Sequence, residues 1–591
     1  MQHRRAWTPI VLLGIVLLGT GLRLWKISSG LPESQIFVHD EIFETFRALQ
    51  LLDGHYDFHR PFKGFYFYIL AVIFGTYGLT QVATGRFGSL EEFVSYSIVH
   101  TGEVMLLSRL TSAILSVLTI YLLYRVGRRV LPRLPWSPAL IFALTWATNG
   151  MSMRLAKWGF VETCVVFLAA AALLPILNLL EYGRRRDYFI AVLLIAAATS
   201  TKIYAGSLVF LLWFAHICRN DPTSRLTLVS RLVTPTLVSA GVAFIALWAL
   251  FDPSLITFLL VKLGKLEAAV PLAPSDAPSV FHFEFYFTTL RWHVGNVMLP
   301  FVVWGLAAAF WHRKRDILIL AGFTAIFVVV IGIKRELHLQ YERYALLALP
   351  SLNLIGVYGI TEVYQVGLRF VSMQGRGANW FLQSGKFAAN LAPLAIAAVL
   401  AWDGIDSLRG LPVHTVESFT PVETEARDWF EQTIPPGSKV AIKGQRVWPG
   451  HQSIPLYDLS ENYTRRYATA QKRMSTSRNM KALPHFEKAA DLVRYNLLVM
   501  DRSEHWDSID KYVQRGIEYF VIYPKEFREE SPERRYFAAQ KSRIRFYEEM
   551  KESDQYHLLK TFDGRTLQGF PKTIEVYGKK PATGSSQDTD S

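Results

Sequence analysis

The chain has 591 residues, of which 51% are hydrophobic, and its formal net charge is +14. Its mean hydropathy is +0.20, and apolar runs of about 20 residues alternate with arginine-rich clusters, which excludes a small soluble domain. The charge does not indicate nucleic-acid binding, because many arginines flank apolar runs, as the positive-inside rule predicts for a membrane protein. Cys164 and Cys218 lie in or beside such runs, so no disulfide framework is indicated.

The N-terminal stretch, MQHRRAWTPIVLLGIVLLGTGLRLWKI, has the basic start and apolar middle of a signal peptide. Its apolar part is long, however, and no A-x-A-like cleavage site follows it. We therefore interpret it as a retained membrane span, with Arg4 and Arg5 holding its start on the cytoplasmic side.

Eleven spans fit the apolar runs best. They cover about residues 8–28, 105–124, 136–152, 159–180, 188–201, 203–217, 232–251, 296–312, 317–333, 344–365 and 387–402. Each inner loop is then basic; these loops contain RVGRRVLPR (125–133), GRRR (183–186), 219–231, HRKR (312–315) and 369–386. The sequence predicts a polytopic α-helical protein of the inner (plasma) membrane, with a cytoplasmic N-terminus.

The pair 188–201 and 203–217 is short for two spans. GRRR (183–186) and CRNDPTSR (218–225) should both be cytoplasmic, so the stretch between them must cross an even number of times. Two helices of about 14 residues each rise only ~21 Å, short of a ~30 Å hydrocarbon core. The tip STKIYAG (200–206) should therefore lie below the outer surface, where polar backbone requires protein or water around it. We expect an outward-facing cavity with Lys202 and Tyr204 in its wall.

The remaining long segments should be extracytoplasmic. Within the loop 29–104, the apolar stretch 64–79 is interpreted as a helix at the outer interface, because counting it as a span would invert every later loop against the arginine pattern. The loop 252–295 is the second outer segment. We thus expect a transmembrane domain over 1–402, a soluble α/β domain over 403–579 and a disordered tail over 580–591.

Two helix–strand patterns support the soluble domain. TPVETEARDWFEQTIPPG is typical of a capped helix ended by Pro-Pro-Gly, and SKVAIKG follows it as a strand. IDKYVQRGIEYFVIYP repeats the order helix, glycine, strand. The domain should therefore contain alternating helices and strands.

Charged and polar residues gather at the outer ends of the predicted spans. Asp40 and Glu41 begin an amphipathic helix, where Asp40 alone could be an ordinary N-cap. The same outer loop holds Arg60 and Lys63, whose simpler role is anchoring at the interface. Further candidates come from MRLAKWGFVET, TKIY and KRELHLQYERYALLALP; they are Arg154, Glu162, Lys202, Tyr204, His338, Arg343 and Tyr344. Transfer from an anionic donor needs such a set, because cations hold a phosphate and a carboxylate takes a proton.

These residues resemble a known family. HDE in the first outer loop, RPFKGFYFY, SRLTSAILSVLTIYLLYRVGRR with Arg109, MRLAKWGFVET and ERYALLALP follow one another as in the lipid-dependent glycosyltransferases of the GT-C fold. Within that fold, the chain resembles the protein O-mannosyltransferase and aminoarabinose transferase group, family 39-like. EARDWFEQTIPPGSKV and TFDGRTLQGFPKTIEVYG are similar to its extracytoplasmic domain. Many relatives have Asp near the position of Glu162, and RPFK replaces a KPP-like element.

The resemblance implies a sugar donor on a polyprenyl phosphate, with transfer to an acceptor protein, lipid or glycan. Asp40 would act as general base and Glu41 would support it, and polyprenyl phosphate would leave with inversion. Either Arg60 or Lys63 would contact the phosphate. No nucleotide is released, and no Gly-rich phosphate loop is present.

We expect no required cofactor and assign no metal ligands, although a divalent cation is left open. HYDFH (55–59) and FHFE (281–284) place metal-binding residue types on one face, but a third convincing ligand is missing. His338 could equally position an acceptor or phosphate, or lie solvated in a loop. The sugar and the acceptor are not specified by the sequence.

Two other classes of protein compete with the enzyme. A transporter or flippase of lipid-linked or anionic substrates would share the spans and the basic cavity, but would place its charges near the midplane, often in paired repeats. A membrane-anchored binding module would need only the tail. Deleting the tail separates these cases, and the charges at the outer ends favour the enzyme.

Overall fold

The computed structural model describes residues 2–29, 31, 39–54, 64–134, 136–219, 232, 234–256, 260, 280–281, 283–334, 342–374, 395–403, 421–443, 454–472, 483–500, 508–524, 537–565 and 571–580. The chain divides into two compact units. The helical unit comprises Met1–Ile27, Gly54–Ile73 and Leu107–Leu411, and the sheet unit comprises Ser28–Asp53, Phe74–Leu106 and Pro412–Ser591. The units do not follow chain order, because much of the first predicted outer loop belongs with the C-terminal region.

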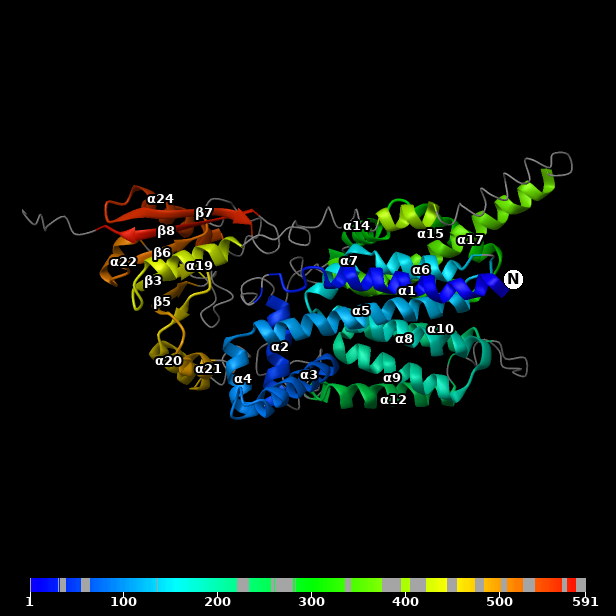
Figure 1. Cartoon of the computed structure of the whole chain (residues 1–591), viewed down its shortest axis with the longest axis horizontal. Coiled ribbons are helices and arrows are strands. Elements are labelled where there is room, and N and C mark those ends of the chain that lie inside the picture. Colours follow the sequence, from blue (N-terminus) through cyan, green and yellow to red (C-terminus); the bar gives the residue numbers. More distant parts are fainter. Residues whose placement is uncertain are drawn as a thin grey trace, which may run out of the picture. The chain divides into compact units, whose positions relative to one another are not determined.

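The helical unit consists mainly of long apolar helices, several of which run in one direction or its reverse (Figure 1). Its elements are α1 (Gln2–Leu24), α5 (Gly102–Val130), α6 (Pro138–Ala147), α7 (Gly150–Lys157), α8 (Val161–Tyr182), α9 (Arg185–Thr201), η2 (Ile203–Ser207), α10 (Leu208–Ile217), α12 (Pro235–Phe251), β1 (Val280–Phe281), α14 (Phe283–Val294), α15 (Met298–Trp311), α16 (Arg315–Gly332), β2 (Ile333–Lys334), η4 (Glu342–Leu347) and α17 (Leu349–Gln374). β1 and β2 pair antiparallel.

Five helices among the described residues are long and apolar enough to cross a membrane; they are α1, α3 (Gly64–Ala83), α5, α8 and α16. A bent pair, α14 and α15, makes a sixth if it counts as one span, and its two parts meet at 102°. The multi-pass helical class is thus confirmed, whereas the number of eleven spans stays a prediction. Because α3 meets the length and composition of a span, its predicted place at the interface also stays a prediction.

One predicted span is wrong as a single helix. Residues 136–152 form α6, which ends at Ala147, and α7, which begins at Gly150. The Asn149 side chain accepts a hydrogen bond of 2.9 Å from the Ser152 backbone N–H, which makes Asn149 the N-cap of α7. Asparagine is among the preferred N-cap residues, so it begins a new helix inside the apolar run.

The predicted break inside 188–217 is confirmed. α9 ends at Thr201, Lys202 is extended (φ −150°, ψ 125°), and η2 separates it from α10. The Lys202 backbone N–H still donates to Ala198 at 2.9 Å, so the last turn of α9 is closed. The two short helices therefore turn at the polar tip, as their length requires.

A fully buried arginine joins four helices of the helical unit. Arg23 of α1 donates to Ser116 of α5 at 2.6 Å, to Ala147 and Trp146 at the end of α6 at 2.9 and 3.2 Å, and to Ser152 of α7 at 2.9 Å. Its fifth bond, of 3.0 Å, goes to its own helix. Carbonyls at the end of a helix lack a helical partner, so this cation satisfies the end of α6.

Two glycines allow α15 and α17 to cross closely. A Cβ atom at Gly305 would lie 2.2 Å from the carbonyl oxygen of Ile355, and one at Gly359 would lie 2.0 Å from that of Phe301. Real Cβ atoms do not come so close, so any side chain would push the helices apart. Small residues play this part at helix crossings in membranes.

The sheet unit contains a six-stranded sheet with the order β4-β5-β3-β6-β8-β7 (Figure 1). The strands are β3 (Lys439–Lys443), β4 (Tyr457–Asp458), β5 (Arg494–Met500), β6 (Tyr519–Ile522), β7 (Tyr556–Arg565) and β8 (Pro571–Lys579). β4, β5, β3 and β6 are parallel, and the hairpin β7–β8 adds antiparallel beside β6. The parallel part requires crossover connections, which the helices supply.

Helices cover both faces of this sheet. α19 (Val422–Thr433) contributes Val422, Ala426 and Phe430 to the core on one face. α22 (Ile509–Gln514) and α24 (Phe537–Glu552) close the core on the other face. The two predicted helix–strand pairs are confirmed as α19–β3 and α22–β6. The residue before α19 is Pro421, which makes no side-chain capping hydrogen bond, and Thr420 lies outside the described residues, so the predicted cap stays a prediction.

The N-terminal part of the sheet unit packs against its C-terminal part. This part contains α2 (His39–Leu52) and α4 (Leu90–Val99), and α4 contacts α21 (Leu483–Lys488). The His485 ring lies 3.2 Å from the Ser95 hydroxyl, and His100 Nε2 lies 2.9 Å from an oxygen of Asp491. Residues almost 400 positions apart thus share one compact unit. The unit also contains α20 (Ser460–Lys472) and the second half of α3.

Candidate functional site

A buried carboxylate joins two cations from separate parts of the chain. Glu162 Oε1 lies 3.1 Å from Lys202 Nζ and 3.3 Å from Arg343 Nε. The side chain of Glu162 is 1% exposed, whereas those of Lys202 and Arg343 are 11% and 12% exposed. The two cations therefore remain slightly accessible to solvent, whereas the carboxylate that they share is buried. We name Glu162, Lys202 and Arg343 the charged cluster.

Each member of the charged cluster stands at the end of a helical element. Glu162 is in the first turn of α8, and Lys202 is the C-cap of α9. An acidic residue at a helix N-terminus and a basic residue at a C-terminus both complement the helix dipole. Arg343 lies in η4, the short 3₁₀ helix before α17. Interrupted helices therefore bring the three charges together within the helical unit.

The turn before Glu162 is fixed on two sides. Gly159 has φ +63°, and a Cβ atom there would lie 2.7 Å from the Ser108 hydroxyl oxygen. Its carbonyl accepts a hydrogen bond of 2.9 Å from the hydroxyl of Tyr66, a fully buried residue of α3. Only glycine tolerates both the left-handed conformation and the close contact. The start of α8, and with it Glu162, is thus held in place.

Aromatic rings line the cations. Lys202 Nζ and the Arg343 guanidinium carbon each lie 5.8 Å from the centre of the Tyr344 ring. Tyr204 meets Tyr344 edge to face, with ring centres 5.3 Å apart. Arg343 also lies 5.1 Å from the centre of the Phe160 ring. Rings of this kind stabilise cations while adding no negative charge.

The balance of charge in the cluster favours an anion. Two cations face one carboxylate, so the three side chains carry one positive charge more than they neutralise when all are ionised. Ionisable residues among membrane-spanning helices commonly mark a substrate site. Chemically, the cluster can hold a phosphate or carboxylate.

The structure brings together five of the predicted site residues. They are Glu162, Lys202, Tyr204, Arg343 and Tyr344. Arg154 lies in the last turn of α7, a helix that packs against α8 and η4. Arg60, Lys63 and His338 lie outside the described residues.

The predicted catalytic pair lies in the sheet unit, at the start of α2. Glu41 is fully buried. The side chain of Asp40 lies outside the described part of the chain, so only its place in the first turn of the helix is known. The roles of both residues therefore stay predictions.

Two neighbours of the cluster were not singled out by sequence. Phe160 lies two residues before Glu162 in WGFVET, and Phe327 of α16 meets the Tyr204 ring with centres 5.9 Å apart. An aromatic residue beside a charged one was the available signal for Phe160. Phe327 stands in an uninterrupted apolar run, where nothing distinguishes it from a core residue.

Metal ligands do not gather in the part of the chain that the structure describes. Within it, no three His, Cys, Asp or Glu side chains stand close enough together to hold an ion. The first predicted His-containing segment, 55–59, lies outside the described residues, and only part of 281–284 is described. A divalent cation therefore stays an open expectation.

Comparisons with known proteins identify the fold. No family model matches the chain, and no curated protein matches its sequence. Among solved structures, ArnT from Cupriavidus metallidurans in the apo state shares 13% sequence identity at a TM-score of 0.50, covering 97% of this chain and 98% of that chain. ArnT bound to undecaprenyl phosphate gives 13% identity, a TM-score of 0.46 and the same coverage.

An oligosaccharyltransferase of Archaeoglobus fulgidus, tethered to an acceptor peptide containing the NVT sequon, shares 12% identity at a TM-score of 0.47, covering 94% of this chain and 73% of that chain. Of these likenesses, the one to apo ArnT extends over almost all of both chains and reaches a TM-score of 0.50. The chain therefore has the GT-C fold that the sequence resemblance predicted.

Proposed function

We propose that the protein is a membrane glycosyltransferase that moves a sugar from a polyprenyl-phosphate donor to an acceptor hydroxyl on the extracytoplasmic side. The observation that carries the proposal is the charged cluster, where Lys202 and Arg343 converge on the buried carboxylate of Glu162. The GT-C fold supports the same class of reaction by analogy.

The cluster suits a phosphate that leaves as an anion. As the bond between the sugar and the phosphate breaks, negative charge grows on the phosphate oxygens. Cations that are already fixed in place stabilise this charge without having to reorganise. Arg343 supplies several donors, and Lys202 supplies a compact charge. Glu162 holds both cations at the ends of α9 and η4, and the Tyr344 ring lies between them.

The reaction needs one further group, a base. The acceptor oxygen would form a bond to the anomeric carbon while the carbon–oxygen bond to the phosphate breaks, and the polyprenyl phosphate would leave with the electron pair. Asp40 would take the hydroxyl proton, and Glu41 would support it, as the family resemblance implies. Single displacement of this kind inverts the anomeric carbon. No nucleotide or redox cofactor is needed.

The proposed setting is the inner (plasma) membrane, with the sheet unit outside the cytoplasm and an acceptor protein, lipid or glycan as partner. Mass spectrometry of envelope proteins and lipids, with and without this chain, should show a missing hexose or pentose and so identify the sugar and the acceptor. A transporter or flippase would instead change the amount of lipid-linked sugar on each side and leave purified acceptors unmodified.

The direct test is Asp40→Asn. Asparagine caps a helix about as well as aspartate, so the variant should fold and bind the donor. It should lose transfer by 10²–10⁴-fold, the usual effect of removing a general base. Asp53→Asn, the same substitution just past the end of α2, is the matched control and should keep activity. Transfer by purified Asp40→Asn above about a tenth of the wild-type rate would reduce Asp40 to a cap.

A further inference from the structure

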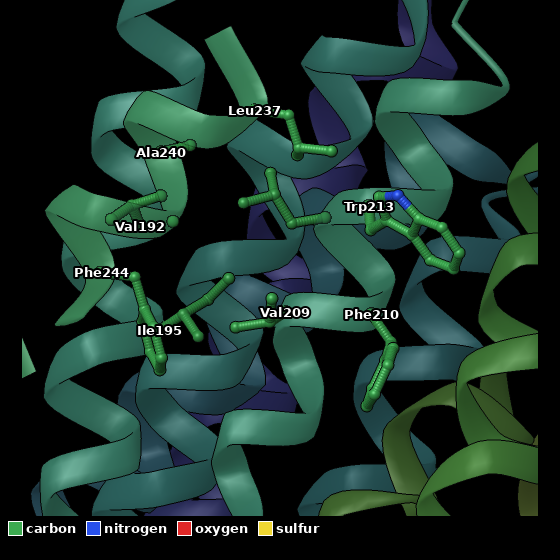
Figure 2. Close-up of a pocket in the computed structure, with 10 residues that line it drawn as sticks. Val192, Ile195, Val209, Phe210, Trp213, Leu237, Ala240 and Phe244 are labelled. Atoms are coloured by element: carbon green, nitrogen blue, oxygen red, sulfur yellow. The ribbon is translucent and has the colours of Figure 1, made fainter. Parts of the chain in front are cut away.

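An apolar cavity lies between three helices, away from the charged cluster. It has a volume of about 310 Å³ and is lined by carbon side chains of α9, α10 and α12 (Figure 2). Val192 and Ile195 come from α9, Val209 and Trp213 from α10, and Leu237 and Phe244 from α12. The volume is at the lower end of the range of ligand pockets. Its lining can recognise only an apolar chain.

α12 stands at the margin of the helical unit and leaves the cavity open toward lipid. Only Ala240 of this helix is buried, while Val242, Ile245 and Leu250 are 65%, 56% and 68% exposed. The helix packs mainly against α9. Its apolar outer face belongs in hydrocarbon, so a lipid chain can reach the cavity from the side.

A polar chain of three residues lies one turn beyond the lining of the cavity. Tyr188 lies one turn before Val192, and its hydroxyl is hydrogen-bonded to Nδ1 of the His216 ring. His216 Nε2 lies 3.1 Å from the hydroxyl oxygen of Thr234, the N-cap of α12. The Thr234 oxygen also accepts a hydrogen bond of 3.2 Å from Leu237 N–H. The cavity therefore changes from apolar to polar within one turn of each helix.

Cations stand at this polar end. The guanidinium of Arg219 interacts with the hydroxyl of Tyr188. Arg315, the first residue of α16, is exposed and donates to the carbonyl of Cys218 at 3.4 Å. GRRR (183–186) spans the start of α9 at the same end. Basic segments mark the cytoplasmic side, where anionic lipid headgroups collect.

We propose that this cavity binds one acyl chain of an anionic glycerophospholipid of the inner leaflet, with the lipid phosphate held at Arg219 and Arg315. The site complements such a lipid in two ways. Its apolar lining suits the acyl chain, and its cations lie at the end where the headgroup belongs. The bound chain fills the space between α12 and α9 and fastens α12 to the rest of the helical unit.

The phosphate of the proposed sugar donor cannot occupy this place. Lys202, at the other end of α9, is 14 residues from Tyr188, which corresponds to about 21 Å along the helix. α9 thus has cations at both ends, and the two ends face opposite membrane surfaces. The proposed lipid site at the inner end has no part in the proposed transfer reaction, so its test is independent of that function.

Binding can be measured on the full chain purified in detergent. Dioleoyl phosphatidylglycerol should raise the melting temperature by a few degrees, and dioleoyl phosphatidylcholine by clearly less. A phosphatidylglycerol with a photoreactive acyl chain should label peptides of α9, α10 and α12. Labelling elsewhere, or equal stabilisation by the neutral lipid, would overturn the proposal, as would displacement of the label by undecaprenyl phosphate.

Two variants with matched controls test the two halves of the site. Gly241 lines the cavity, and a Cβ atom there would meet nothing within 4 Å, so Gly241→Leu should fold and fill the space. It should abolish stabilisation by phosphatidylglycerol, whereas Val242→Leu on the exposed face should retain it. Normal lipid response in Gly241→Leu would contradict the proposal.

Arg219→Gln should weaken binding of phosphatidylglycerol by about tenfold and remove its preference over phosphatidylcholine, because one charge-assisted contact to phosphate is lost. Arg125→Gln, at an exposed arginine of α5 outside the proposed site, should leave both unchanged. An undiminished preference in Arg219→Gln would show that the headgroup lies elsewhere. The labelling experiment needs no variant and decides the question if Gly241→Leu fails to fold.

Discussion

Two buried arginines of the helical unit hold their charge in different ways. Arg23 is fully buried, and its five hydrogen bonds go to carbonyl and hydroxyl oxygens of neutral groups. Arg343 keeps 12% of its side-chain surface, pairs with Glu162 and has Lys202 beside the same carboxylate. The first arginine uses all its donors on neutral groups inside the protein, whereas the second shares one carboxylate with another cation and keeps some accessible surface.

This difference separates a structural cation from one that can act on a ligand. A guanidinium whose donors are all satisfied has nothing to offer a substrate, however deeply it lies in the membrane domain. A cluster with excess charge and some accessible surface can bind an anion. Burial of a charge alone therefore does not identify a binding site. The partners of the charged group show whether it is structural or can bind a ligand.

The largest expected effect is on stability, from Arg23→Leu. It would remove the Arg23 donor from the Ala147 carbonyl at the end of α6, and would leave the Trp146 carbonyl with backbone donors alone. We expect a loss on the order of 3 kcal/mol, or about 5–10 °C in melting temperature. Purified protein in detergent can be melted with and without the change, and Arg125→Leu, an exposed arginine of α5, is the matched control. Equal melting of Arg23→Leu and wild type would mean that Arg23 does not hold these helices together.

The next effect is on activity, from Arg343→Ala. Charge-assisted contacts to phosphate contribute roughly 1.5–3 kcal/mol, so kcat/KM for the lipid-linked donor should fall by tens-fold. Arg343→Lys should recover part of the loss, because it keeps the charge but not the planar fork. Melting temperature should change less than in Arg23→Leu. Unchanged kinetics at normal protein levels would remove Arg343 from the site and leave the cluster a structural ion network.

A smaller effect should distinguish these two interpretations of the cluster. Glu162→Gln keeps the shape of the side chain but removes the charge that balances Lys202 and Arg343. We expect a loss of about 1–2 kcal/mol in stability, because the two cations then repel each other with reduced compensation. Undecaprenyl phosphate should restore more stability to this variant than it adds to wild type, since its phosphate replaces the missing charge. Failure of the lipid to rescue Glu162→Gln would argue against a phosphate site.

The sequence allowed the residues of the charged cluster to be recognised, but it did not reveal the role of Arg23. Glu162, Lys202 and Arg343 interrupt apolar runs at their ends, so each was recognisable as an unusual residue in a predicted membrane segment. Arg23 stands at the end of its run too, where it could not be distinguished from an ordinary flanking arginine. Its partners come from three other helices, and no local pattern specifies them.

Some features of the fold were likewise predicted from the sequence, and others were not. The break near Lys202 followed from helix length against bilayer thickness, and the alternation of helix and strand predicted α19–β3 and α22–β6. The interruption at Asn149 was missed because the apolar residues continue on both sides of it. The packing of α4 on α21 depends on contacts between distant parts of the chain, which periodicity does not report.

The smallest expected effect concerns a lysine next to Arg23. Lys157, at the end of α7, is 7% exposed and has its Nζ 5.6 Å from the centre of the Trp25 ring. Burial, and then the charges of Lys26 and Arg23, lower the pKa of Lys157 from 10.5 to about 8. Between these two pKa values the folded chain binds fewer protons than the unfolded chain, so stability should rise with pH through this window.

Below the folded pKa the penalty of burying the charged lysine is fully present and no longer changes with pH. The melting temperature should therefore be higher at about pH 9.5 than at about pH 7.5, by about 2–4 °C. Lys157→Met has no proton to lose, so this rise should disappear, and it should shrink in Arg23→Leu because one repelling charge is gone. The two arginines would then differ in a further respect, because Arg23 also influences the charge of a neighbouring lysine, whereas the role proposed for Arg343 is to bind a ligand. A rise that persists unchanged in Lys157→Met would assign the pH dependence to another group.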